Sequence, residues 1–277
     1  MRQRSAWLIF SLVMLVYLFF FLIPLGSVIK GGFFVDGGFT LAYITGVFSN
    51  PIYREGLFNS LLIGLGTTLL ATVIALPLAW AANRFTFPFK GTLTALLLVP
   101  MILPPFVGAI GFQQIFGQYG ALNAALNLGP IDWLANGRYF GVIVLQALSL
   151  YPIMYLNVAA ALANIDPAMR EAAENMGGSG FTTFRRITLP LMMPAIITMS
   201  MLSLIATFNS FDIIWILTQG GPSGETTTMI IDTYQTAIGS KKYGEGAARA
   251  VVICIFLSLF CIAYFNVTRR LAATGKA

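Results

Sequence analysis

The sequence of 277 residues contains no histidine, and only 9% of its residues are charged. The absence of histidine removes the commonest general base and the commonest metal ligand, which disfavours most hydrolase and metalloenzyme functions. The phosphate-binding pattern GxxxxGK[ST] is also absent. Cysteine is scarce: Cys254 and Cys261 lie in one apolar run and are interpreted as ordinary apolar side chains. We therefore expect no enzyme, no resident metal and no ATP site on this chain.

Hydrophobic residues make up 57% of the sequence. Soluble domains carry roughly 25% charged residues, so this composition predicts an all-α protein embedded in a bilayer. The formal net charge is +6, but the basic residues are scattered at the ends of apolar runs. This distribution indicates membrane topology and disfavours a nucleic-acid partner.

Six apolar runs are long enough to cross a hydrocarbon core about 30 Å thick as helices. We expect them to form one transmembrane domain over residues 1–277. The first run is too long for the apolar part of a signal peptide and lacks an A-x-A cleavage site, so we expect it to be retained. The predicted spans are approximately Ala6–Ile29, Leu57–Ala82, Thr92–Phe116, Tyr139–Ala163, Ile187–Leu217 and Ala247–Thr268.

Basic residues predict the orientation of these spans. Six spans place both termini on one side, and that side carries ten of the 16 lysines and arginines. The cytoplasmic set is Arg2, Arg4, Arg84, Lys90, Arg170, Arg185, Arg186, Arg269, Arg270 and Lys276. The opposite set is Lys30, Arg54, Arg138, Lys241, Lys242 and Arg249. We therefore expect a multi-pass protein with cytoplasmic termini and a cytoplasmic loop between spans four and five.

Proline occurs within several predicted spans, most densely in the run VPMILPPFVG, residues 99–108. Proline removes a backbone donor and bends a helix, and such bends persist in membranes where neighbours or a cavity satisfy the freed carbonyls. Simple packing explains any single proline, whereas this run favours a pathway or a gate.

A charged segment between spans four and five, EAAENMGGSGFTTFRRITLP, interrupts the apolar sequence. Asp166 followed by Pro167 predicts a helix start. One apolar stripe follows at helical spacing, and glycines from Gly177 onward predict a sharp reversal. The stripe consists of Met169, Ala172, Ala173 and Met176. A helix this short is not stable alone in water, so it needs a partner surface; the alternative is a loop resting on lipid headgroups.

The same segment resembles a known motif. The string E-A-A, three residues, G, nine residues, I-x-L-P is present as Glu171-Ala172-Ala173, Gly177 and Ile187 to Pro190. It is similar to the EAA loop of permease subunits of binding-protein-dependent type I ABC importers, and the six spans extend the resemblance over essentially the whole chain. The resemblance implies the fold of that group: six transmembrane helices with a short cytoplasmic coupling helix, here residues 166–177, between spans four and five.

The resemblance also implies partners and residue roles. The coupling helix would dock on a cytoplasmic ATPase dimer that holds ATP and magnesium, with Glu171 making a polar contact and Gly177 forming the turn. The close-packed face would comprise Ala172 and Ala173, flanked by Met169 and Met176. Further implied partners are a second homologous permease subunit and an extracytoplasmic solute-binding protein, in the cytoplasmic membrane of a bacterium or archaeon.

A second stretch, FNSFDIIWILTQGGPSGETTTMIIDTYQTAI, Phe208 to Ile238, resembles carbohydrate permeases of this group. By that resemblance, the residues at sugar-lining positions are Gln146, Leu150, Thr207 and Ser210, with Asn209 beside them. In the relatives these positions are rich in asparagine, and here they are not. Direct contact of this chain with the sugar is therefore in doubt, since in some permease pairs only one of the two subunits contacts the cargo. Asp212 is an ionisable group near the end of a span and is interpreted as a cargo, gate or subunit contact.

Other functions stay open at this point. Residues Leu98 to Asn123 also resemble span three of ferric-iron, polyamine and phosphonate permeases. A membrane-embedded enzyme would need a second carboxylate in a facing span besides Asp212, and a secondary transporter would need two inverted halves. A carbohydrate importer is favoured over all three.

Overall fold

The computed structural model describes residues 2–35, 37–137 and 139–273. Five of its helices are long and apolar enough to cross a membrane, or six if one bent pair counts as a single span. The chain thus has the predicted all-α membrane fold, and it also contains a small antiparallel pair of strands, β1 (Phe34–Val35) and β2 (Gly38–Phe39). The chain divides into two compact units, described separately below.

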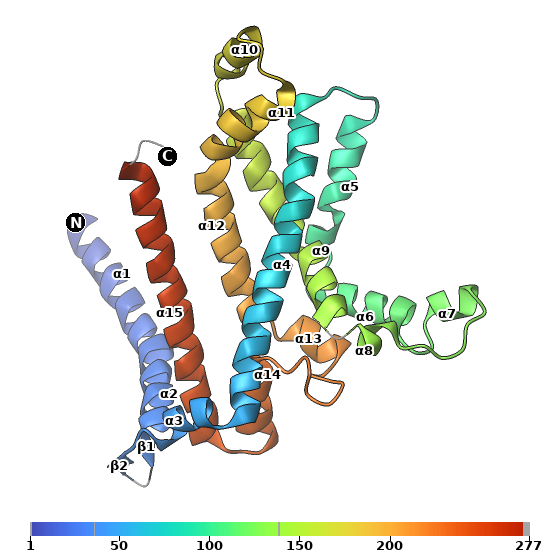
Figure 1. The fold of residues 1–277 in the computed structure, drawn as a ribbon. Helices are drawn as coiled ribbons and strands as arrows, with labels where there is room; N and C mark the ends of the chain where they lie inside the picture. Colours follow the sequence, from blue (N-terminus) through green and yellow to red (C-terminus); the bar gives the residue numbers. More distant parts are fainter. Residues whose placement is uncertain (1, 36, 138, 274–277) are drawn as a thin grey trace. The chain divides into compact units, whose positions relative to one another are not determined.

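The first unit comprises Met1–Leu57 and Met229–Phe256. It begins with a continuous helical stretch formed by α1 (Arg2–Tyr17), η1 (Leu18–Leu22) and α2 (Ile23–Phe33) (Figure 1). The strands, α3 (Ala42–Ser49) and the start of α4 (Pro51–Arg84) follow. Later in the chain come α14 (Met229–Tyr234), η3 (Gln235–Gly239) and the first part of α15 (Tyr243–Ala273).

Close packing in the first unit depends on a glycine. A Cβ atom at Gly32 would lie 3.1 Å from backbone atoms of Ala248, tighter than ordinary van der Waals contact. The end of α2 can therefore approach the backbone of α15 only because position 32 lacks a side chain. By contrast, the described side chains of α1 are exposed, as expected for an apolar helix in lipid.

The second unit comprises Phe58–Thr228 and Leu257–Ala277. Its long elements are most of α4, α5 (Lys90–Ile102), α9 (Tyr139–Ala163), α12 (Leu189–Phe208) and the second part of α15 (Figure 1). Alanines of α4, including Ala71, Ala75 and Ala79, pack with Tyr151, Met154 and Val158 of α9 to form its core. Small side chains thus let the two helices approach closely, as is usual between membrane helices.

Shorter helices lie at the two ends of this bundle (Figure 1). One end carries α10 (Pro167–Asn175), α11 (Gly180–Thr183) and η2 (Phe184–Thr188). The other carries α6 (Pro105–Phe116), α7 (Ala121–Ala125), α8 (Trp133–Asn136) and α13 (Asp212–Leu217). The functional features described below lie at these two ends.

Span boundaries show where the sequence-based prediction holds and where it is wrong. The predicted span Tyr139–Ala163 coincides with α9. The predicted span Thr92–Phe116 is wrong as one continuous helix, because Lys90–Ile102 and Pro105–Ala125 are separated by a bend of 98°. The bent pair can still form one broken span, so the sixth span stays a prediction. Leu103 and Pro104 are extended there, with ψ values of 130° and 136°, since a residue before proline is pushed away from helical geometry.

The predicted span Ile187–Leu217 is also wrong at its end. Helix α12 stops at Phe208, and α13 forms a separate helix from Asp212 onward. The side-chain amide of Asn209 donates to the carbonyl of Ile205 at 3.1 Å, a local bond that competes with continuation of the helix. The helices of the first, second and sixth predicted spans run several residues further into polar sequence than the apolar runs do.

Some basic residues used for the topology prediction cannot be placed. Arg138 and Lys276 lie outside the described residues, and the side chains of Arg2, Arg4 and Arg270 also fall outside the described part. The predicted orientation of the termini stays a prediction.

Candidate functional site

A cavity of about 460 Å³ lies in the second unit, beside the break between α5 and α6. Its walls come from the proline-rich break, α9, the end of α12 and the start of α13. All six residues predicted for the substrate pathway line this one cavity: Gln146, Leu150, Thr207, Asn209, Ser210 and Asp212. The fold therefore brings together two groups of residues that lie far apart in the sequence, while their contact with a cargo stays a prediction.

The local backbone explains why polar groups gather here. The end of α12 at Phe208 leaves Asn209 and Ser210 outside any helix before Asp212 begins α13. The break at Leu103 and Pro104 interrupts the helical ladder on the facing wall. Irregular backbone at membrane depth is tolerated where it lines a cavity or is buried in protein, and both breaks border this cavity.

Two buried polar atoms in the cavity wall have no hydrogen-bond partner among the described residues: Nε2 of Gln146 and Oγ1 of Thr207. Gln146 is 1% exposed and Thr207 is 3% exposed. The other amide atom of Gln146, Oε1, accepts a hydrogen bond from Oγ1 of Thr67 at 3.3 Å. An unmade hydrogen bond of this kind costs about 1–3 kcal/mol. Both atoms are buried inside the cavity wall, and the exposed or partly exposed polar side chains that line the cavity are those of Ser149, Asn209, Ser210 and Asp212.

Charge and aromatic character further define the cavity. Asp212 is the one ionisable residue among the described residues that line it, and its side chain is exposed. The ring of Phe211, which also lines the cavity, stacks on Trp215 with centroids 5.5 Å apart. A mostly apolar wall with a few hydrogen-bonding groups and an aromatic ring suits a ligand with hydroxyl edges and apolar faces.

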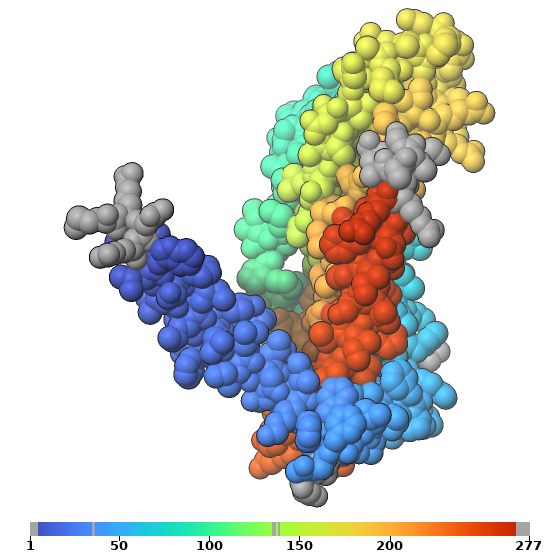
Figure 2. Space-filling model, turned by 90° about the vertical axis from the view of Figure 1, so that its left-hand side faces the viewer, coloured from blue at the N-terminus to red at the C-terminus, as the bar shows by residue number. Residues whose placement is uncertain are grey.

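The helix predicted between spans four and five is present as α10. Oδ1 of Asp166 accepts a hydrogen bond from the backbone N–H of Ala168 at 2.9 Å, as expected for a capping carboxylate. Gly177 has a φ of +85°, the left-handed conformation that reverses the chain after a helix. Figure 2 shows this segment, coloured yellow, at the end of the second unit.

The predicted apolar stripe of α10 has one buried and several exposed members. Ala173 is buried within the second unit, whereas Met169, Ala172 and Met176 are exposed, Met176 by 82%. Glu171 is also exposed. A nine-residue helix that presents Met169 and Glu171 outward, followed by the exposed Met176 at its C-cap, is suited to contact a partner. The roles predicted for these residues stay predictions.

An ion pair that the sequence analysis missed ties α10 to the rest of the second unit. Nη2 of Arg84, the last residue of α4, lies 2.8 Å from Oε1 of Glu174. The two residues are 90 positions apart. Helical periodicity relates residues three or four apart, so no local pattern could have revealed this contact.

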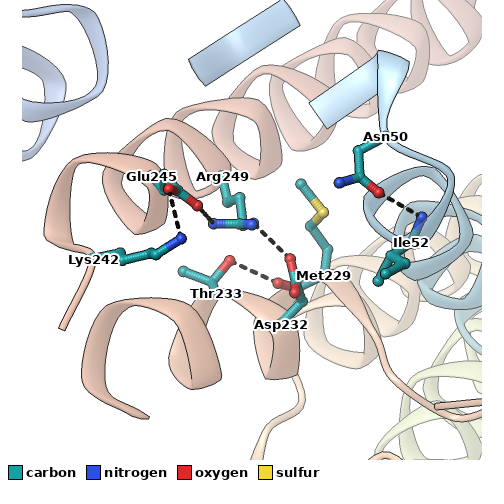
Figure 3. Close-up of polar contacts among 8 residues, drawn as sticks. All are labelled: Asn50, Ile52, Met229, Asp232, Thr233, Lys242, Glu245 and Arg249. Atoms are coloured by element: carbon teal, nitrogen blue, oxygen red, sulfur yellow. Dashed lines mark hydrogen bonds and ion pairs between the residues drawn. The ribbon is translucent and has the colours of Figure 1, made fainter. Parts of the chain in front are cut away.

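A buried charge cluster in the first unit was also missed (Figure 3). Nε of Arg249 lies 2.6 Å from Oδ2 of Asp232, and its Nη1 lies 3.7 Å from Oε2 of Glu245. The guanidinium also covers the ring of Tyr53 at 3.9 Å from the centroid. Burial raises the pKa of the Asp232 carboxyl, and the charge of Arg249 opposes that rise.

Within the described residues, no group of three or more Cys, Asp and Glu side chains is arranged to hold a metal ion. Cys254 and Cys261 form no disulfide bond within the described residues.

Comparison with known proteins identifies relatives of the chain. Residues 71–273 match the family described as binding-protein-dependent transport system inner membrane component. The trehalose/maltose transport system permease protein MalF of Thermococcus litoralis is 31% identical over 206 residues, covering 72% of this chain and 69% of the relative. The sulfoquinovosyl glycerol transport system permease protein SmoG of Agrobacterium fabrum is 31% identical over 271 residues, covering 96% and 86%.

A solved structure has the same fold. It is a bacterial ABC transporter involved in the import of the acidic polysaccharide alginate, and the match covers 97% of both chains with a TM-score of 0.82. Sequence identity is 17%, so this likeness concerns the fold.

Proposed function

The chain belongs to the family of binding-protein-dependent transport system inner membrane components, and on that premise we propose that it forms half of the translocation pathway of an ATP-driven carbohydrate importer. In this proposal a second, homologous permease subunit supplies the other half. An extracytoplasmic binding protein delivers the cargo, and a cytoplasmic ATPase dimer binds ATP and magnesium. Both termini of this chain are cytoplasmic.

The observation that carries the proposal is the exposed surface of α10. A nine-residue helix is too short to be stable by itself, so its order depends on contacts with other structure. Its outward methionines, Met169 and Met176, are uncovered within the chain. Docking on an ATPase would bury them and place Glu171 in the interface, while Gly177 keeps the turn that orients the helix.

The cavity supports a neutral, hydroxyl-rich cargo. The side chains of Asn209 and Ser210 line the cavity without being buried and can exchange hydrogen bonds with sugar hydroxyls, and the aromatic side chain of Phe211 lines it as well. A phosphonate would meet no positively charged residue among the described cavity-lining residues, and ferric or polyamine cations would meet the single carboxylate of Asp212. Two relatives carry carbohydrate transport in their names: trehalose and maltose of the one are neutral sugars, as this chemistry favours, whereas sulfoquinovosyl glycerol of the other is an anionic sugar sulfonate.

Two measurements test the proposal. The full chain is purified from its own membranes in mild detergent, and we expect an ATPase and a second permease subunit to copurify with it. The variant Gly177→Pro should abolish hydrolysis stimulated by the loaded binding protein, because proline cannot adopt the φ of +85°. Intact stimulation in this variant would refute the docking role of α10.

The cargo is identified separately, by thermal unfolding of the binding protein with added solutes. Neutral mono- and oligosaccharides should raise its melting temperature. Stabilisation by ferric iron, a polyamine or a phosphonate alone would overturn the carbohydrate assignment and leave the transport machinery in place.

A further inference from the structure

The ion pair between Arg84 and Glu174 joins two elements with different tasks. Arg84 ends α4, the longest helix of the chain, and Glu174 lies near the end of α10. Nε of Arg170 also lies 4.0 Å from the same carboxylate oxygen, one helical turn away. Two guanidinium groups thus converge on Glu174, and the one from α4 is the closer.

Helix α4 is also tied to the cavity wall. Oγ1 of Thr67 donates to Oε1 of Gln146 at 3.3 Å, and Gln146 lines the cavity. On the next residue, Oγ1 of Thr68 donates to Oγ of Ser203 in α12 at 3.2 Å. Seventeen residues separate Thr67 from Arg84, so at 1.5 Å per residue the helix spans about 25 Å between its two attachments.

The covalent connections of α10 to the neighbouring helices are short segments outside any helix. Residues 164–166 link it to α9, and Met176 to Ser179 link it to α11 through the adjacent glycines Gly177 and Gly178. A displacement of α10 can be absorbed by rotation at these joints. The contact with α4 bypasses them, because it joins α10 directly to a helix that continues through Pro77 to Thr67.

We propose that Arg84 and Glu174 are positioning residues that fasten α10 to α4, so that α4 carries displacements of α10 to Gln146 in the cavity wall. The inference rests on the proposed function, in which an ATPase moves α10. In this proposal, displacements of α10 reach the cavity wall through α4 as well as along the chain through α9 and α12. It also assigns the two residues of the pair a role that differs from the outward-facing Glu171.

Exposure of the pair decides what kind of test is needed. The two side chains are 29% and 36% exposed, and ion pairs at such sites contribute little to overall stability. Melting temperature is therefore a poor measure of the tether. The test therefore measures the accessibility of a residue in the cavity and exchanges the two charges of the pair. This combination distinguishes transmission of movement from a contribution to stability alone.

The experiment uses the complete complex in lipid nanodiscs, with Cys254 and Cys261 replaced by serine and Ser149→Cys as a reporter. Position 149 lines the cavity. The rate of maleimide labelling is measured with and without ATP plus vanadate. With the native pair, we expect ATP and vanadate to change the rate roughly tenfold, in the range of typical allosteric couplings.

Arg84→Glu and Glu174→Arg should each bring the ratio of the labelling rates with and without ATP plus vanadate close to one. Each variant places two like charges together and so breaks the ion pair. The charge-exchanged double variant should restore the ratio. Arg185→Glu is the matched control, because Arg185 is an exposed arginine of η2, at the same end of the second unit, and it should keep the native ratio of labelling rates.

Unchanged ratios in both single variants would overturn the tether while leaving the proposed function standing. Failure of the double variant to restore coupling would also overturn it, because the charges would then act on other partners. An absence of any ATP response with the native pair would instead refute the proposed function itself.

Discussion

Arg249 and Asp232 form a buried ion pair, with 2.6 Å between Nε and Oδ2, that joins α15 to α14 in the first unit. Arg249 is 1% exposed, and Glu245 and Lys242 are the other charged groups of the cluster. A buried charge of this kind depends on its partners, since water cannot solvate it. The largest loss of stability is therefore expected when one member of the pair is removed and the other stays buried.

We predict that Arg249→Met destabilises the protein by about 3–5 kcal/mol, because it leaves the Asp232 carboxylate buried without its nearest cation. Thermal unfolding of the purified complex, followed by tryptophan fluorescence, measures the effect. The double variant Arg249→Met/Asp232→Asn is the control and should recover much of the loss, since it removes both charges.

The same variant predicts a pH dependence. Burial already raises the pKa of Asp232, and removal of the opposing Arg249 charge raises it further. A group with a raised folded-state pKa stabilises the protein below its unfolded pKa of about 4 and loses that contribution as pH rises through the folded pKa. The deficit of Arg249→Met should therefore be larger at pH 8 than at pH 5. An equal deficit at both values would contradict this reasoning.

The predictable parts of this fold are those with a local physical cause. Helix α9 agrees with the prediction over its whole length because a predominantly apolar run without charged residues fills Tyr139–Ala163. The start of α10 follows from Asp166 and Pro167, and its end from Gly177. Pro104 and Pro105 also indicate a break between α5 and α6. The break is missed because apolar residues continue on both sides of the two prolines, which gives one long hydrophobic run.

The rest depends on contacts between distant residues. Family resemblance predicts Gln146 and Thr207 as pathway residues, but only the folded chain shows that they border one cavity and that each has an unpartnered atom among the described residues. The sequence predicts a loop or a membrane side for each member of the two ion pairs, but it does not predict the pairing. The pairs are Arg84 with Glu174 and Arg249 with Asp232. Pairing across the fold is determined by packing, which periodicity and composition do not encode.

Gly177 provides a prediction about the turn after α10. Its φ of +85° strains any residue with a side chain, although a Cβ there would meet no atom within 4 Å. Gly177→Ala should therefore cost about 1 kcal/mol locally and lower binding-protein-stimulated ATP hydrolysis. Gly177→Asn should be milder than Gly177→Val, because asparagine tolerates this conformation.

Gly91→Ala is the control for this series. Gly91 has an ordinary φ, and the space around it is also open, so alanine should have no effect on hydrolysis. A loss of stimulation equal to that of Gly177→Ala would show that backbone conformation is not the cause.

Thr207 should show opposite effects on stability and transport. Its Oγ1 is buried without a partner, so Thr207→Val removes an unsatisfied hydroxyl at nearly constant shape. We expect melting temperature to stay equal or to rise by the equivalent of about 1 kcal/mol, while KM for uptake of the identified cargo increases. Uptake into proteoliposomes and thermal unfolding are measured on the same preparation.

Thr198→Val is the matched control for Thr207→Val. Oγ1 of Thr198 lies 2.9 Å from the hydroxyl of Tyr264 and donates to the carbonyl of Pro194 at 2.8 Å. Its removal should lower stability by about 1 kcal/mol and leave KM unchanged. If both valine variants destabilise alike and neither changes KM, the hydroxyl of Thr207 does not serve the cargo.

Asp212 should set the electrostatic potential of the cavity, because it is the one ionisable group among the described residues that line it. In the Ser149→Cys background, a cationic thiosulfonate reagent should react a few-fold faster than an anionic one of similar size, as expected for a nearby charge under partial screening. Asp212→Asn should bring the two rates together, and Asp212→Lys should reverse their order. Both variants should stay within about 0.5 kcal/mol of native stability, since the side chain is exposed. Equal reactivity of the two reagents with the native Asp212 would show that this carboxylate does not control charge in the cavity, and the preference for neutral cargo would then need another source.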